Sequence, residues 1–199
     1  NELFIDFAGK KLEIVNALTG EVLAVEVFVA TLPCGQYTYV EACLSQKKEE
    51  LIKCTENALR FFGGVPKAIV SDNLKSAVNR SSKYEAEINR SFKDFARHYN
   101  CVINPTRAYA PQDKALVENA VQLTYQRIYY PLREMTFFSL AELNKEIWHH
   151  LENYNNLFFS RKEASRKELF QSIERDLLKP LPTEKYEIIG YKRAKVQKI

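Results

Sequence analysis

Three acidic residues, Asp6, Asp72 and Glu118, occur where the surrounding sequence predicts regular secondary structure. Asp6 interrupts the apolar run of residues 3–7, and Asp72 follows the apolar run of residues 69–71. A carboxylate buried in such surroundings costs several kcal/mol unless a partner or a metal ion compensates its charge. Carboxylate oxygens are preferred ligands of hard divalent ions, and a pair of these ions roughly 3.5–4 Å apart catalyses displacement at phosphate. The three acids together point to metal-assisted chemistry on a phosphodiester.

Each acid also has a simpler interpretation when it is considered alone. Asp72 and Asn73 together are typical of a turn in which the side chains bond their own backbone. Asp6 can face water at a strand end, and Glu118 can form a helix salt bridge with Lys114, one turn earlier. The residues themselves leave these alternatives open.

The periodicity of the chain predicts the elements that position these residues. We expect strands at residues 3–7, 12–15, 22–32, 37–43, 69–72 and 101–103, and helices after Ser45, over residues 88–99 and from Pro111 to about Pro131. Tight turns favour an antiparallel meander in which residues 12–15 pair back on the first strand. This order predicts an α/β, ribonuclease-H-like fold with a mixed five-stranded sheet flanked by helices.

The composition is that of a globular protein, with 46% hydrophobic residues and no apolar run of transmembrane length. We expect a core domain over residues 1–135, a helical extension or linker over 136–179, and the start of a truncated domain over 180–199. The net charge of +4 is uneven, since residues 160–199 hold 11 Lys and Arg against 6 Asp and Glu. A basic tail suits a polyanionic partner, although a solvated charged face explains the same count.

The four cysteines form no CxxC pair, and we interpret them as reduced thiols of a cytoplasmic protein. The chain begins with Asn1 rather than Met, which we interpret as the sign of a fragment.

Four motifs resemble the catalytic cores of IstA-type insertion-sequence transposases, within the retroviral-integrase superfamily. They are Phe61-Phe62-Gly63-Gly64-Val65-Pro66, Asp72-Asn73-Leu74-Lys75-Ser76-Ala77-Val78, Phe95-Ala96-Arg97-His98-Tyr99, and Ala110-Pro111-Gln112-Asp113-Lys114-Ala115-Leu116-Val117-Glu118-Asn119. The resemblance covers about residues 1–135. Phe7 stands where the family often has Trp.

The resemblance implies an Asp-Asp-Glu metal site made of Asp6, Asp72 and Glu118, with Mg²⁺ as cofactor and Mn²⁺ as a substitute. It also implies cleavage of transposon ends and strand transfer into target DNA by a bacterial, nucleoid-associated protein. A homo-oligomeric assembly and an ATP-dependent helper protein would be its partners, with no membrane involved.

Candidate phosphate contacts near the metal ions are Asn73, Lys75, Arg107 and Lys114. For Lys75 and Arg107 a solvated surface position is an equal alternative. Two other functions stay open: a nuclease of the same fold that only hydrolyses, and a catalytically inactive DNA-binding or assembly module.

Overall fold

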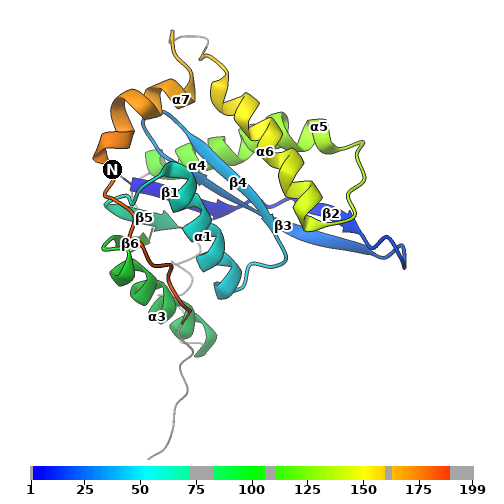
Figure 1. Cartoon of the computed structure of the whole chain (residues 1–199), viewed down its shortest axis with the longest axis horizontal. Helices are drawn as coiled ribbons and strands as arrows, with labels where there is room; N and C mark the ends of the chain where they lie inside the picture. The colour runs from blue at the N-terminus through cyan, green and yellow to red at the C-terminus, as the bar shows by residue number, and fades with distance from the viewer. Residues whose placement is uncertain (1, 72–82, 106–110, 160–162, 189–199) are drawn as a thin grey trace, which may run out of the picture.

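The central sheet is built around β3 (Val22–Thr31), a ten-residue strand whose residues from Val25 onward are all buried. The computed structural model describes residues 2–71, 83–105, 111–159 and 163–188 (Figure 1). The buried part of β3 has an antiparallel strand on each side: β4 (Thr38–Cys43) pairs with residues 26–31, and β1 (Glu2–Phe7) pairs with residues 28–31. Helices on both faces of the sheet contact this strand (Figure 1), which explains why the segment is almost continuously apolar.

Two parallel strands complete the sheet beyond β1. β5 (Ala68–Ser71) pairs with β1, and β6 (Val102–Pro105) pairs with β5. The predicted mixed sheet is therefore confirmed, with an antiparallel part at β1, β3 and β4 and a parallel part at β1, β5 and β6.

The sheet has six strands rather than the predicted five, because all six predicted strand segments, β2 (Leu12–Val15) included, belong to it. The prediction that residues 12–15 pair back on the first strand is wrong. β2 pairs with residues 22–25 of β3. Ala8, the residue that follows β1, also bonds β3, because its N–H donates to the carbonyl of Val27 at 2.8 Å. β1 pairs with only the C-terminal part of β3, so the N-terminal part remains available to β2.

Helices lie on both sides of the sheet, with α1 (Lys48–Phe62) in front of it and α4 (Pro111–Thr124) behind it in Figure 1. The predicted stop of the first helix is confirmed, because Gly63 adopts a left-handed conformation (φ 72°) and caps α1. α3 (Lys83–His98) precedes β6. α4 continues into the π-helical turn η1 (Tyr125–Tyr129) and the short α5 (Tyr130–Leu132).

α6 (Leu140–Asn156) covers the open edge of β4, and its N-terminus is capped by Ser139, whose hydroxyl accepts the N–H of Glu142. The side-chain amides of Asn144 and Asn155 each bond both backbone polar groups of one β4 residue: Ala42 and Thr38, respectively. The Trp148 indole N–H donates to the carbonyl of Val40 between them at 3.0 Å. These bonds satisfy an edge that would otherwise present unpaired backbone groups.

The chain after α6 packs against the same body. α7 (Arg166–Leu169), the π-helical η2 (Phe170–Glu174) and the 3-10 helix η3 (Arg175–Leu177) place the Phe170 ring on Tyr37, with centroids 4.6 Å apart. Residues 178–188 contain no helix or extended strand, and Val65 pairs with Lys179 in an isolated bridge. In the described part of the chain, no helix has the length and apolar character needed to span a membrane.

Candidate active site

Asp6 is the penultimate residue of β1 and lies between two neighbouring strands. It stands opposite Val29 of β3, and on the other side β1 runs parallel to β5. Its side chain is half-buried, and one carboxylate oxygen accepts the N–H of Phe7 at 2.8 Å. The predicted placement of Asp6 on a strand is confirmed, and its neighbours Ile5 and Phe7 are buried in the core.

The register between β1 and β5 relates Asp6 to the second acid, Asp72. The last described pair joins Ile5 to Ser71, so Asp6 follows one member of this pair and Asp72 follows the other in the chain. Parallel strands present the residues after their carboxyl ends at one edge of the sheet. Asp72 itself lies outside the described residues, as do Asn73, Lys75 and Arg107.

The third acid is carried by α4, which packs against β1 and β3. Ala120 and Thr124 are buried one turn apart, and the Thr124 hydroxyl donates to the Ala120 carbonyl at 2.9 Å. Glu118 is exposed and therefore lies off this buried face. Lys114 belongs to the same helix, but its side chain lies outside the described set. The structure thus places Asp6 and Glu118 on contacting elements.

Two tyrosines that the sequence analysis did not single out connect these elements. The Tyr125 hydroxyl accepts the backbone N–H of Lys10 at 2.9 Å, and the Tyr129 hydroxyl donates to the carbonyl of the same residue at 2.7 Å. Their rings meet edge to face with centroids 4.9 Å apart. The π-helical turn that continues the Glu118 helix is thereby bound to the segment that follows Asp6. The spacing of the tyrosines was visible in the sequence, but their partner more than a hundred residues away was not.

The chemistry available to this site follows from its donor atoms. Carboxylate oxygens on a strand end and on a neighbouring helix suit a hard divalent cation such as Mg²⁺. A strand holds its ligand rigidly, whereas an exposed glutamate on a helix has more freedom to adjust. Asp6 and Glu118 therefore offer donor atoms of the kind that such a cation prefers, one on a strand and one on a helix that packs against that strand.

Comparison with known proteins adds relatives that span nearly the whole chain. No model of a known protein family matches it. It is 42% identical over 191 residues to a putative transposase of Sinorhizobium fredii, covering 96% of this chain and 37% of that protein. It is 37% identical over 195 residues to a putative transposase for insertion sequence IS1162 of Pseudomonas fluorescens, covering 98% and 35% respectively. The chain thus spans little more than a third of the length of these relatives.

Solved structures with the same fold include retroviral integrase cores. The catalytic core domain of BIV integrase superposes with a TM-score of 0.61 at 10% identity, covering 88% of this chain and 96% of that one. The HTLV-2 integrase catalytic core domain in complex with magnesium gives a TM-score of 0.55 at 16% identity, covering 85% and 95% respectively. These comparisons confirm the ribonuclease-H-like fold and the resemblance to insertion-sequence transposases.

Proposed function

We propose that this chain, a homologue of insertion-sequence transposases with the fold of a retroviral integrase catalytic core, cleaves transposon ends and joins them to target DNA. The observation that carries the proposal is the parallel pairing of Ile5 of β1 with Ser71 of β5, together with the packing of α4 against β1. It supports a site in which Asp6, Asp72 and Glu118 meet at one edge of the sheet. Residues 1–135 would form the catalytic core, with 136–179 as its helical extension and 180–199 leading into a further domain.

Asp6, Asp72 and Glu118 would hold Mg²⁺, or Mn²⁺ in its place, and their oxygen donors fit such ions. Bound in a pair, the ions would activate the attacking oxygen and stabilise the leaving oxygen of an in-line displacement. The Phe7 N–H orients the Asp6 carboxylate, and the packing of Ile5 and Phe7 in the core keeps the strand from shifting. Glu118 would complete the site from the helix as the substrate enters.

The DNA would be held by side chains around this edge: Asn73, Lys75, Arg107 and Lys114. Contacts of this kind with phosphates fix the position of a duplex without reading its sequence. A homo-oligomer and an ATP-dependent helper protein would complete the assembly at the nucleoid. The homo-oligomer is supported by solved structures of similar fold, which include a simian T-cell lymphotropic virus intasome and the HTLV-2 integrase core in dimeric and trimeric forms.

The test is strand transfer by the full-length protein on labelled transposon ends, with Mg²⁺ and with EDTA. Asp6→Asn, Asp72→Asn and Glu118→Gln remove one ligand charge each with little change in volume, and each should abolish both cleavage and joining. Glu134→Gln is the matched control, because Glu134 is an exposed acid paired with Arg133 on the surface. An Asp72→Asn protein with normal activity would overturn the assignment.

The same assay separates the proposal from its alternatives. Cleavage without joining would indicate a nuclease, and DNA binding without either reaction would indicate an inactive assembly module. Lys114→Ala should weaken DNA engagement by the full-length protein more than it lowers the melting temperature. A purely structural, solvent-exposed pair of Lys114 and Glu118 would contribute only about 0–1 kcal/mol.

A further inference from the structure

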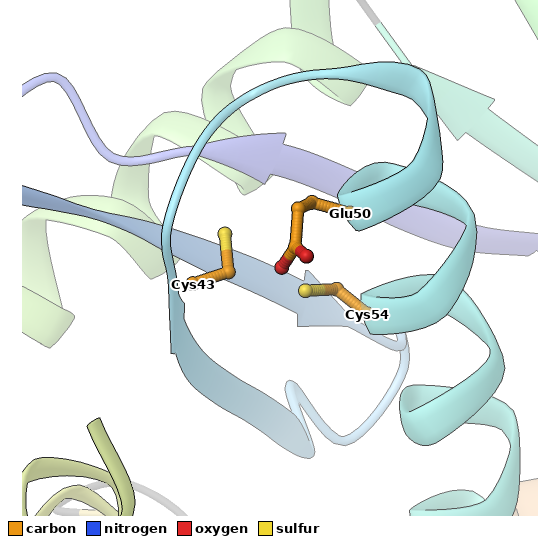
Figure 2. Close-up of side chains that lie close together, drawn as sticks. All are labelled: Cys43, Glu50 and Cys54. Atoms are coloured by element: carbon orange, nitrogen blue, oxygen red, sulfur yellow. The ribbon is translucent and has the colours of Figure 1, made fainter. Parts of the chain in front are cut away.

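Three potential metal ligands converge at the C-terminal end of β4: Cys43, Glu50 and Cys54. Figure 2 shows their side chains directed toward one another, with the Glu50 carboxylate beside the two sulfur atoms. One ligand atom from each residue lies within 4.8 Å of the other two. Within the part of the chain that the structure describes, no other group of three His, Cys, Asp or Glu residues meets this criterion. The cluster borders β4, which β3 separates from β1 and Asp6.

The backbone fixes all three positions. Cys43 ends β4 and is paired with Glu26 of β3, so its place is set by the sheet. Glu50 and Cys54 are four residues apart on α1, which puts them on one face of the helix, one turn apart. The ligands therefore come from two elements whose packing the core already determines, and little ordering would be needed on binding.

The spacing of the three ligand atoms suits a cation with tetrahedral coordination and sulfur ligands. Zn–S bonds are about 2.3 Å long, which puts two sulfur ligands of one zinc ion roughly 3.8 Å apart. A cluster that lies within 4.8 Å needs only a small inward movement to reach that geometry. Cys43 and Cys54 are 2% and 1% exposed, whereas Glu50 is partly exposed. The glutamate thus marks the side from which an ion and a water molecule can enter.

The local charge also favours a cation. A hydrogen bond with Cys43 and burial raise the pKa of the Cys54 thiol most, and the carboxylates of Glu41 and Glu50 raise it further. A cation that binds here would displace the thiol proton and offset the negative charge of these acids. Glu41 is occupied as an acceptor, since it takes hydrogen bonds from the Tyr39 hydroxyl and the Asn57 amide. With an ion bound nearby, Glu41 would therefore act as an outer negative charge rather than as a ligand, in the way that outer partners commonly support a metal site.

We propose that Cys43, Glu50 and Cys54 bind one divalent cation of the zinc class, with water in the fourth position. Two cysteine thiolates select zinc over magnesium or calcium, which prefer oxygen ligands. The ion would join the end of β4 to the first half of α1 across the Leu44–Lys47 connection. This site lies beyond the proposed DNA-joining function and does not depend on it.

The test is zinc binding by the full-length protein after treatment with reductant and chelator. ZnCl₂ is titrated against a chromophoric zinc indicator in buffer with excess Mg²⁺, so that oxygen-ligand sites are occupied. The wild type should bind one equivalent more than Cys54→Ala or Cys43→Ala, and CoCl₂ should produce a sulfur-to-cobalt charge-transfer band that both variants lack. Glu50→Gln, at a partly exposed position, should fold normally and weaken zinc binding by at least about 10-fold.

Matched controls separate this site from the other thiols and from the acidic site. Cys34→Ala and Cys101→Ala remove the two remaining cysteines and should leave the extra equivalent of zinc unchanged. Asp6→Asn should also retain it, even if strand transfer is lost. Equal zinc binding by wild type and Cys54→Ala, with Glu50→Gln folded and unchanged, would overturn the proposal. So would a Cys43–Cys54 disulfide that forms in air while the reduced protein takes up no zinc.

Discussion

The hydroxyl of Tyr129 donates a hydrogen bond of 2.7 Å to the backbone carbonyl of Lys10, four residues after Asp6. Tyr125, one turn earlier, accepts the N–H of the same residue, so both backbone polar groups of Lys10 are held by one π-helical turn. Burial raises the pKa of Tyr129, which keeps its hydroxyl in the neutral, donating form. This turn continues the helix of Glu118, and the two bonds therefore set that helix against the strand of Asp6.

We expect Tyr129→Phe to impair strand transfer by the full-length protein by about 10- to 100-fold, because small displacements of reacting groups have effects of this size. Its free energy of unfolding should fall by only about 0.5–1.5 kcal/mol, the net value of one hydrogen bond. Single-turnover strand transfer and urea denaturation measure the two effects. Tyr130→Phe is the control, since Tyr130 is exposed and stacks on Arg133. Normal activity in a destabilised Tyr129→Phe protein would refute the positioning role.

Glu174→Ala should lower the free energy of unfolding by about 1–3 kcal/mol, because it removes the acceptor for two backbone N–H groups. The Glu174 carboxylate accepts the N–H of Cys34 at 3.0 Å and that of Gly35 at 3.1 Å, and it is buried against the β3–β4 loop. Urea denaturation checks the value. Asp176→Ala, two residues further at an exposed position, should change it by less than about 0.5 kcal/mol. Equal effects of the two substitutions would show that Glu174 contributes nothing specific.

Glu26 should make stability depend on pH on the acidic side. Burial acts to raise the pKa of Glu26, but hydrogen bonds from Lys11 and Gln46 and the charge of Lys11 outweigh it, so the pKa lies below its usual value. A lowered pKa means that the folded protein favours the ionised form. The resulting stabilisation is present above the unfolded-state pKa of about 4.3 and is lost as the pH falls through the folded-state value.

Urea denaturation of wild type and Glu26→Gln at several pH values between 7 and 3 measures this dependence. The stability difference between the two proteins should be largest near neutral pH and should shrink as Glu26 becomes protonated. Glu21→Gln, in the exposed turn between β2 and β3, provides the comparison. A difference that stays constant or grows toward acid pH would contradict the assignment.

Local sequence determined much of the secondary structure because its causes lie within a few residues. The apolar runs predicted β1, β3 and β4, and the glycine after Phe62 predicted the left-handed end of α1. The pattern also located Asp6 on a strand and Glu118 on a helix. Each of these features depends on backbone periodicity or on the conformational freedom of one residue.

Only the tertiary structure decided which distant segments meet. A four-residue strand such as β2 has an apolar pattern that fits several partner strands. It pairs with β3 because β1 pairs only with residues 28–31 of β3 and leaves residues 22–25 available. Tyr129 and Lys10 are 119 residues apart, and Glu174 and Cys34 are 140 apart. Cys43, Glu50 and Cys54 carry no recognisable spacing motif, because the sheet supplies one ligand and the helix supplies the other two. Such contacts arise from the packing of whole elements, which no local window of the sequence contains.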